Sequence, residues 1–414
     1  MKIVNLKEES ERCLLCKNAR CQSACPINTE IPKIIEMYKE KKYLEAGKIL
    51  FENNPMSVVC SLICPFENQC MGSCIRGIKG EPIDFPQIEN FLSQKYLNEV
   101  ELIADKRKNK RIAVIGSGPA GLTVAFILSQ KGYGVTIFEK HEKIGGVLRY
   151  GVPEFRLSND ILDIMETKLI KLGAKFRYNE VIGNTTTVDD LLSDSYDAVF
   201  IGSGVWNARK LGIPGETLGH VSYAINYLKS PKTFNFGKKV VIIGAGNVAM
   251  DAARTAKREG KDTTIIYRRS LSDAPATKLE IREALEDGVE VLEFNSPLRI
   301  VEDGIYLEQT EYKIDENGDK KLVIIPNSEY LYEADEIIIA VSQVPRDIIV
   351  SKTKEIKVND RGTIITNKCG QTTFNGVFSS GDVVTGAKTV VEAVRDTKIV
   401  AEAMENYLEG KYSC

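Results

Sequence analysis

Three patterns in the sequence predict an α/β fold in which two Rossmann-like units, one inserted into the other, follow a small helical domain. Two stretches, starting at Arg111 and at Lys239, each show a buried strand, a glycine-rich turn, a helix and a second strand. This is the order of elements in a dinucleotide-binding unit. The third pattern is the placement of the cysteines, because eight of the ten fall between residues 13 and 74, ahead of both stretches.

Composition and charge describe an ordinary globular chain. It has 414 residues, 43% hydrophobic and 27% charged, and a formal net charge of −2. So small a net charge gives no electrostatic reason to expect binding to nucleic acid or to an anionic membrane. The opening MKIVNLKEESER lacks the apolar core of a signal peptide, and no apolar run reaches the ~20 residues of a membrane helix. We therefore expect a cytoplasmic protein of two or three domains.

The cysteines form two groups of four. The groups are Cys13-x2-Cys16-x4-Cys21-x3-Cys25-Pro26 and Cys60-x3-Cys64-Pro65-x4-Cys70-x3-Cys74. In a reducing cytoplasm such a block is more typical of metal binding than of disulfides. Eight thiols can hold two four-iron clusters, and a Cys-Pro step ends the cysteine run of two-cluster ferredoxins. Structural zinc is the alternative, because Cys13 and Cys16 form a C-x-x-C pair.

Helical patterns surround the cysteine loops. Apolar residues recur at helical spacing from 31 to 54, where Asn53-Asn54-Pro55 ends the run, and residues 88–100 predict another helix. The expected domain is small, so bound metal would substitute for a large apolar core. The basic segment 105–111 is interpreted as a solvated linker rather than a nucleic-acid patch.

The first glycine-rich turn has the complete dinucleotide pattern. A strand at 112–115 leads into Gly116-x-Gly118-x-x-Gly121, a helix, and a second strand that ends at Glu139. The first glycine makes the tight turn, the second lets the backbone approach pyrophosphate, and the third packs the helix on the strand. Pyrophosphate would lie at the helix N-terminus, and Glu139 is placed to accept hydrogen bonds from a ribose.

The second glycine-rich turn repeats this pattern with two changes. It has Gly244 and Gly246, but Ala249 replaces the third glycine, an accepted small substitute. Its second strand ends in Arg268 and Arg269 instead of an acid. Arginine suits the 2′-phosphate of NADP because its guanidinium makes bidentate contacts with phosphate. NADPH is therefore favoured over NADH, with two exposed arginines of no function as the alternative.

Three further segments predict strands that complete the two sheets. Residues 196–204 and 334–345 each show a buried strand and a turn, and residues 377–382 show a strand ending in Gly381-Asp382. A helix then opens near Thr389 and continues to Tyr407. An acid at a strand end can hold a ribitol hydroxyl, and a helix N-terminus can face the electron-rich edge of a flavin.

With the cysteine block added, nearly the whole chain resembles the glutamate synthase small subunit family. This family includes the large subunit of ferredoxin–NADP transhydrogenase and the N-terminal half of dihydropyrimidine dehydrogenase. The motifs that carry the resemblance are RCLLCKNARCQSACP, CPFENQCMGSC, IGSGPAGL, GGVLRYGVPEFRL, GAGNVAMD and SSGDVVTGAKTVVEAV. Length, the start close to Cys13 and the ending YLEGKYSC are most similar to the A subunits of bacterial two-subunit NAD(P)-dependent dihydropyrimidine dehydrogenases.

The resemblance implies ligands for two [4Fe–4S] clusters. One cluster would use Cys13, Cys16, Cys21 and Cys74, and the other Cys25, Cys64, Cys70 and the non-thiolate Glu89. Cys60 lies outside this set and is expected to be a small buried hydrophobe.

The resemblance also implies the nucleotide-binding residues. For FAD these are Gly116, Gly118, Pro119, Ala120, Gly121, Glu139, Lys140, Gly145, Gly146, Arg149, Arg156, Gly381, Asp382, Thr389, Val390 and Val391. For NADPH or NADH they are Gly244, Gly246, Asn247, Val248, Arg268 and Arg269. One departure is Ser342, because members of the family usually have glycine there, in Ala-x-Gly-Gln.

These expectations combine into domains and a function. Residues 1–107 would form the iron–sulfur domain, 108–230 with 350–414 the FAD domain, and 231–349 the NAD(P)H domain. No catalytic side chain is expected, because FAD itself accepts the hydride. The resemblance implies that electrons pass to a partner in a hetero-oligomer. That partner would be an FMN/iron–sulfur dehydrogenase subunit, a glutamate synthase large subunit or a ferredoxin-linked protein. A zinc-stabilised nucleotide-binding module without turnover is the remote alternative.

Overall fold

The computed structural model describes residues 5–315, 318–345 and 348–411, which form two compact units. The first unit comprises Met1–Arg149, Glu154–Val205 and Val344–Cys414, and the second comprises Tyr150–Pro153 and Trp206–Gln343. The boundaries predicted for three domains remain predictions.

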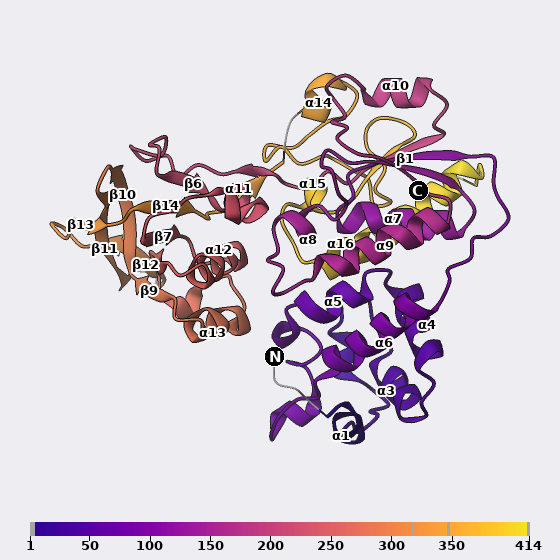
Figure 1. Ribbon diagram of the computed structural model, residues 1–414, viewed down its shortest axis with the longest axis horizontal. Coiled ribbons are helices and arrows are strands. Elements are labelled where there is room, and N and C mark those ends of the chain that lie inside the picture. The colour runs from indigo at the N-terminus through magenta and orange to yellow at the C-terminus, as the bar shows by residue number, and fades with distance from the viewer. Residues whose placement is uncertain (1–4, 316–317, 346–347, 412–414) are drawn as a thin grey trace. The chain divides into compact units, whose positions relative to one another are not determined.

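The N-terminal part of the first unit is helical, as predicted (Figure 1). Its helices are α1 (Leu6–Glu11), α2 (Arg20–Ser23), α3 (Ile31–Lys39), α4 (Tyr43–Asn53), α5 (Ser57–Ile63) and α6 (Phe85–Glu99). The helical run expected over 31–54 is divided in two because Lys41 has a φ of +60°, a left-handed conformation that a right-handed helix cannot continue through. Cys21 and Cys60 lie in helices rather than in loops.

The helices enclose a core of their own. Ile34, Ile35, Leu50, Ile88 and Leu92 are buried together, and four of the cysteines pack against this cluster. The small domain therefore has an apolar core beside its cysteines.

A parallel five-stranded sheet forms the rest of the first unit, in the order β16-β4-β1-β2-β3. Its strands are β1 (Arg111–Ile115), β2 (Gly134–Phe138), β3 (Lys175–Arg177), β4 (Ala198–Ile201) and β16 (Val377–Ser379). The helices in this region are α7 (Pro119–Gln130), α8 (Val147–Tyr150), α9 (Asn159–Lys171), α10 (Val188–Ser193), α14 (Ile348–Lys352), α15 (Asp382–Thr385) and α16 (Val390–Leu408). The pairing of Val377 with Val199 brings the C-terminal strand into the first sheet, which confirms the predicted insertion of one unit into the other.

The helical part packs on this sheet's helices. The ring of Phe51 in α4 meets that of Phe126 in α7 edge-on, with centroids 5.4 Å apart. The ammonium of Lys168 in α9 donates to the carbonyl of Val100 at 2.6 Å. Both parts therefore belong to one compact unit.

The second unit contains a parallel sheet in the order β6-β14-β7-β8-β9. Its strands are β6 (Val221–Tyr223), β7 (Lys239–Ile243), β8 (Asp262–Tyr267), β9 (Glu290–Glu293) and β14 (Glu336–Ile339), and its helices are α11 (Ala224–Lys229), α12 (Asn247–Arg258) and α13 (Lys278–Glu286). Two short strands, β5 (Asn207–Ala208) and β15 (Gln343–Val344), lie outside this sheet. The first glycine-rich turn thus lies between β1 and α7 and the second between β7 and α12, as predicted.

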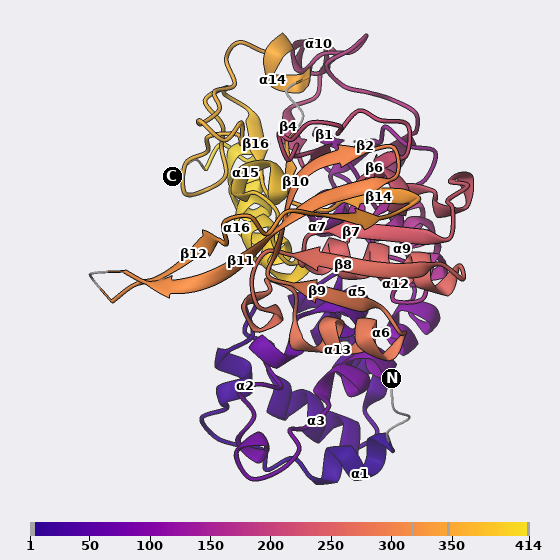
Figure 2. The ribbon, with the colours of Figure 1, turned by 90° about the vertical axis from the view of Figure 1, so that its left-hand side faces the viewer.

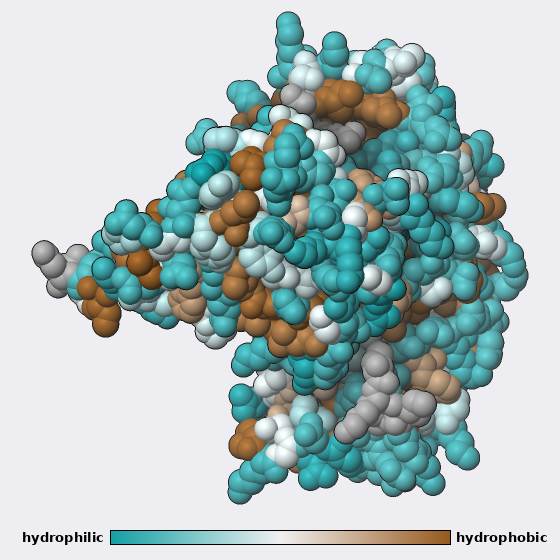
Figure 3. All heavy atoms as spheres, turned by 60° about the vertical axis from the view of Figure 1, so that its left-hand side comes forward, coloured by the Kyte–Doolittle hydropathy of each residue, from teal (hydrophilic) through white to brown (hydrophobic). Residues whose placement is uncertain are grey.

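An antiparallel layer in the second unit was not predicted. It comprises β10 (Asn295–Val301), β11 (Gly304–Ile314), β12 (Lys320–Ile324) and β13 (Tyr330–Glu333). The β11–β12 hairpin extends away from its own sheet (Figure 2). Ile314 and Ile324 are exposed on it, and apolar spheres are visible toward its end (Figure 3).

None of the helices in the described ranges is both long enough and apolar enough to span a lipid bilayer.

Candidate functional site

In the first glycine-rich turn, glycine stands at each of the three positions for a different physical reason. Gly116 has a φ of +93°, and a Cβ there would lie 2.7 Å from the carbonyl oxygen of Gly202. A Cβ on Gly121 would lie 1.9 Å from the oxygen of Gly116, so only glycine lets α7 approach the turn. A Cβ on Gly118 would meet open space. The second position is therefore where an outside group can approach the backbone, at the start of α7, where Pro119 and Ala120 follow.

The acid at the end of β2 is held firmly against this turn. Glu139 is buried, and its carboxylate accepts hydrogen bonds from Ser117 N at 3.0 Å and Ser117 Oγ at 2.6 Å. Its other oxygen accepts one from His141 N at 2.9 Å. A carboxylate has about four lone-pair positions, so Glu139 can still accept from a ribose hydroxyl. The sequence analysis missed Ser117, the variable residue between the first two glycines.

The segment after β2 also returns to the turn. Gly146 has a φ of +53°, and a Cβ there would lie 2.9 Å from Gly118 Cα. Gly145 N donates to the carbonyl of Ser117 at 3.1 Å. The guanidinium of Arg149 donates to the carbonyl of Ile144 at 2.8 Å and pairs with Asp163, so it braces this segment. Lys140 and Arg156 are half-buried.

The C-terminal segment that follows β16 also lies close to this turn. Gly381 has a φ of +78°, and a Cβ there would lie 3.0 Å from the Cβ of Ala120. Burial raises the pKa of Asp382 to about 6, against the effect of a hydrogen bond from Lys388 N. Thr389 caps α16 in a capping box with Glu392, ahead of Val390 and Val391 at the helix start. Gly146 and Gly381, from two distant parts of the sequence, thus both lie close to the first glycine-rich turn.

The second glycine-rich turn has the same geometry. Gly244 has a φ of +123°, and a Cβ there would lie 2.5 Å from the oxygen of Ala340. The nearest atom to a Cβ on Gly246 would be 3.8 Å away, so this position is open as well. Asn247 and Val248 begin α12, and Ala249 is fully buried in place of the third glycine.

The two arginines at the end of β8 are exposed. Within the described ranges, neither the Arg268 nor the Arg269 side chain has an ion pair or a side-chain hydrogen bond. Their guanidinium groups are therefore available to an anionic ligand.

Ser342, the departure from the family pattern, has a backbone conformation that favours glycine. Its φ is +118°, a value that non-glycine residues seldom adopt. Its carbonyl accepts a hydrogen bond from Arg209 N at 3.1 Å. The glycine expected from the resemblance thus has a conformational reason, and the serine is strained.

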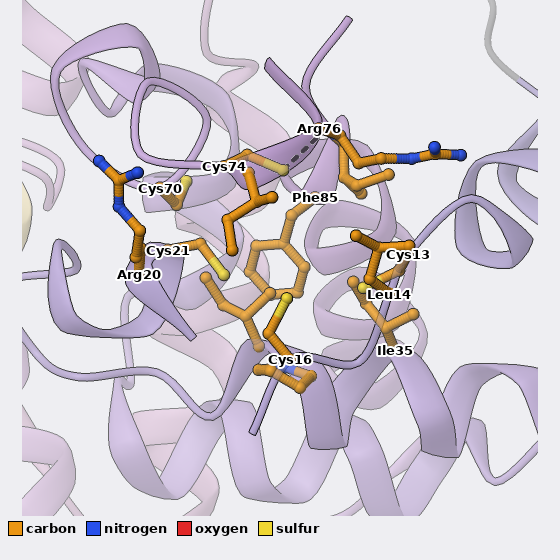
Figure 4. Close-up of a pocket in the computed structure, with 14 residues that line it drawn as sticks. Cys13, Leu14, Cys16, Arg20, Cys21, Ile35, Cys70, Cys74, Arg76 and Phe85 are labelled. Atoms are coloured by element: carbon orange, nitrogen blue, oxygen red, sulfur yellow. Dashed lines mark hydrogen bonds between the residues drawn. The ribbon is translucent and has the colours of Figure 1, made fainter. Parts of the chain in front are cut away.

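Five cysteines line a cavity in the helical part. They are Cys13, Cys16, Cys21, Cys70 and Cys74, together with apolar side chains such as Ile35, Ile83 and Phe85, and Figure 4 shows them near the ring of Phe85. Burial raises the pKa of Cys21 to about 11, and the charges of Cys74 and Cys13 raise it further. Ile83 N donates to Cys74 Sγ at 3.5 Å. Four of the five cysteines are those that the resemblance assigned to one cluster, and the fifth, Cys70, was assigned to the other.

The other four predicted ligands form a second group, of which Cys70 also lines the cavity of the first. Burial raises the pKa of Cys70, and the charges of Glu89 and Cys25 raise it further. The pKa of Cys64 is also raised, mainly by a hydrogen bond with Cys60, then by burial and by the charges of Cys60, Glu89 and Cys70. The Cys60 thiol is buried as predicted, but its contact with Cys64 makes it more than an apolar filler.

Glu89 belongs to this second group although it lies on helix α6. It is 8% exposed, and burial raises its pKa to about 8. Among the described residues its carboxylate has neither an ion pair nor a hydrogen bond. A buried carboxylate without a partner is costly, and a metal would stabilise it. Helix α6 therefore does not present Glu89 to solvent.

The two groups have the chemistry of cluster ligands. All eight cysteines of the block are free thiols, and the cavity around the first group is otherwise mostly apolar. In the described part of the chain, no three His, Cys, Asp or Glu side chains meet as the ligands of a single metal ion. In a four-iron cluster each ligand binds a different iron, so the ligands surround a larger space. The residues present therefore fit such clusters.

Fold and site together define an oxidoreductase that uses two dinucleotides and an iron–sulfur domain. The chain belongs to the pyridine nucleotide-disulphide oxidoreductase family, whose model matches residues 111–397, with a second match at 74–186. The model described as dihydropyrimidine dehydrogenase domain II, 4Fe-4S cluster, matches residues 2–100. The chain is thus an NAD(P)H-dependent FAD oxidoreductase with a 4Fe-4S domain, and the interpretation of the cysteine block as a zinc site is not supported.

Relatives cover almost the full chain. The small chain of NADPH glutamate synthase from Escherichia coli K12 is 30% identical over 97% of this chain and 91% of its own. The PreT subunit of the NAD-dependent dihydropyrimidine dehydrogenase of the same organism is 33% identical over 98% and 95%. The structure of Mycobacterium tuberculosis FprA in complex with NADPH aligns with a TM-score of 0.61 and 20% identity, over 73% of this chain and 85% of that one. That likeness supports the fold alone.

Proposed function

We propose that this chain is the electron-input subunit of a larger enzyme, taking a hydride from NADPH and delivering single electrons to a partner subunit. The observation that carries the proposal is the gathering of eight candidate cluster ligands into two groups, within the same compact unit as the FAD-type sheet. When bound, FAD supplies the conversion of a hydride into single electrons, and the clusters supply one-electron carriers.

The chain's own residues bind and orient the nucleotides. The open backbone at Gly118 and the free N–H groups at the start of α7 suit pyrophosphate, because a helix N-terminus favours anions. Glu139 would accept hydrogen bonds from the ribose, and Asp382 from the ribitol. Arg268 and Arg269 would bind the 2′-phosphate, which makes NADPH the favoured donor.

The two ligand sets are those that the resemblance implies, and the proximity of their members supports them. Cys13, Cys16, Cys21 and Cys74 would bind one [4Fe–4S] cluster. Cys25, Cys64, Cys70 and Glu89 would bind the other, and the carboxylate would alter its net charge and hence its potential.

Replacement of Glu89 tests the second ligand set. In Glu89→Ala, one cluster should become labile or change its spectrum, so that anaerobically purified protein keeps between about four and eight irons. Glu89→Cys supplies a thiolate and should restore a stable cluster, while Glu99→Ala removes an exposed acid from the same helix and should change nothing. NADPH-driven reduction of a flavin-accepting dye should persist in all three variants. Iron content and spectra unchanged in Glu89→Ala would remove Glu89 from the ligand set.

Electrons would leave from the side of the first cluster. Leu14 and Ile75 are 57% and 39% exposed and line the cavity formed by the first cysteine group. Arg20 and Arg76 line it too (Figure 4), and neither has an ion pair within the described ranges. Apolar side chains with unpaired arginines are typical of a protein interface, and the two cations suit a redox partner with an acidic face.

Charge reversal tests this exit. Arg20→Glu with Arg76→Glu should slow electron transfer to an acidic haem protein such as cytochrome b5 and weaken the salt dependence of that transfer. Transfer to the basic cytochrome c should rise instead. Arg361→Glu at an exposed site elsewhere in the same unit is the matched control. If the double variant reduces both acceptors as the wild type does, electrons leave elsewhere.

The partner subunit decides the final reaction. The 33% identity to the PreT subunit favours a dihydropyrimidine dehydrogenase partner, and the 30% identity to a glutamate synthase small chain gives the second candidate. Purification of the native complex, followed by assays of NAD(P)H-dependent pyrimidine reduction and of glutamate formation, separates the two candidates.

A further inference from the structure

A half-buried lysine connects the FAD-side helix α16 with the helical part that holds the cysteines. The Lys398 ammonium donates to the carbonyl oxygen of Asn53 at 2.7 Å and to its Oδ1 at 2.8 Å. No carboxylate pairs with Lys398 among the residues that the structure describes. The hydrogen-bond partners of the ammonium are thus neutral oxygen atoms, and no ion pair with a described residue cancels its positive charge.

From Asn53 the hydrogen bonds continue to a predicted cluster ligand. Because an ammonium can only donate, Oδ1 of Asn53 faces Lys398 and Nδ2 faces the other way. Nδ2 donates to the carbonyl of Ile27 at 3.2 Å and to Thr29 Oγ1 at 3.4 Å. Thr29 is 4% exposed, and its Oγ1 lies 3.4 Å from Cys25 Sγ.

The donor direction along this chain is fixed by chemistry. A cysteine that binds iron is a thiolate, which can only accept. The Thr29 hydroxyl therefore donates a hydrogen bond to Cys25 Sγ, while it accepts one from Asn53 Nδ2. In this series of hydrogen bonds, the donors of Lys398, Asn53 and Thr29 therefore all point toward Cys25. Hydrogen bonds aligned in this way polarise one another.

We propose that Lys398, acting through Asn53 and Thr29, raises the reduction potential of the cluster bound by Cys25. This inference rests on the proposed function, because it requires that a cluster is present. Reduction adds a negative charge to a cluster, and a nearby cation or a hydrogen bond to a ligand sulfur stabilises that charge. Burial lowers the pKa of Lys398 and the charge of Cys25 raises it, so a negative charge on the Cys25 side favours the ammonium.

The position of Lys398 suits a role between the two cofactor regions. It lies eight residues into α16, whose first turn holds the predicted FAD contacts at 389–391, which is about 12 Å along the helix axis. A higher potential at this cluster would favour its acceptance of electrons from the flavin side. Lys398 would thus be a positioning residue that acts through others and touches no reacting atom.

Redox titration of the holoenzyme, followed by EPR, tests the proposal. Lys398→Met should make reduction of one cluster about tenfold less favourable, which is about 59 mV for one electron, and should leave the other cluster unchanged. Lys398→Arg keeps the charge and should restore the wild-type potential. Lys354→Met is the matched control, since it removes an exposed lysine of the same unit, just beyond α14. Iron content and thermal unfolding check that each variant is intact.

A second pair of variants keeps the test decisive if Lys398→Met folds poorly. Thr29→Val removes the hydroxyl at nearly constant shape and should lower the potential of the same cluster, whereas Thr29→Ser should not. The proposal is overturned if both Lys398→Met and Thr29→Val titrate as the wild type, or if Lys354→Met shifts the cluster equally. Absence of four-iron clusters from the wild type would instead contradict the proposed function.

Discussion

Replacement of Ser342 by glycine should stabilise the second unit. Ser342 has a φ of +118°, and a non-glycine residue in such a conformation costs of order 1–3 kcal/mol. Glycine removes that strain but loses more backbone entropy on folding, about 0.5–1 kcal/mol. The net gain is then about 0.5–2 kcal/mol. At roughly 3 °C per kcal/mol for a unit of this size, the transition should rise by about 2–6 °C.

The measurement is differential scanning calorimetry of flavin-loaded protein. Ser342→Ala is the matched control, because it removes the hydroxyl and keeps the Cβ that causes the strain. The hydrogen bond from Arg209 N to the carbonyl of residue 342 uses backbone atoms and is available in all three proteins. The glycine variant should therefore unfold at a higher temperature than both the alanine variant and the wild type. Equal gains for alanine and glycine, or a lower transition for glycine, would refute the assignment of strain.

Two further predictions concern the nucleotide sites. Arg268→Ala combined with Arg269→Ala should lower kcat/KM for NADPH relative to NADH by about 150-fold, because the lost charge-assisted hydrogen bonds are worth at least about 1.5 kcal/mol each. An equal loss for both nucleotides would contradict the assignment of the two arginines to the 2′-phosphate. Asp382→Asn should change the pH dependence of the flavin-free protein, because burial raises the pKa of Asp382 from 3.8 to about 6. The folded state then holds the proton more tightly, so the contribution of Asp382 to stability is full below about pH 4 and is lost as the pH rises through about 6. In urea unfolding the Asn variant should match the wild type at pH 4 and exceed it by up to about 3 kcal/mol above pH 6, and a gap that does not grow with pH would contradict this sign.

The local features were predictable because they depend on neighbours in sequence. A Cβ on Gly121 would meet the carbonyl oxygen of Gly116 in the same turn, so the spacing of these two glycines alone indicates the structure. The strands of both parallel sheets are short apolar runs, which a buried strand requires. The break at Lys41 was missed because the apolar residues on both sides keep helical spacing.

The long-range features needed the resemblance or the structure. Nothing in the spacing of the cysteines indicates whether Cys74 shares a ligand set with Cys13 or with Cys70, and all three line one cavity. The burial of Glu89 depends on which face of α6 meets the other helices, and the sequence around it has apolar residues on more than one side. Ser117 and Thr29 are single polar residues whose partners lie elsewhere in the fold. The antiparallel strands at 295–333 mix polar and apolar residues and gave no strong pattern.

The central claim is that two four-iron clusters and one flavin serve a single chain. Analysis of iron, acid-labile sulfide, zinc and flavin in anaerobically purified protein tests it most directly. We expect about eight irons, eight sulfides and one FAD per chain, with no stoichiometric zinc. One zinc or more per chain without iron would contradict it, and about four irons would leave one of the two ligand sets without a cluster.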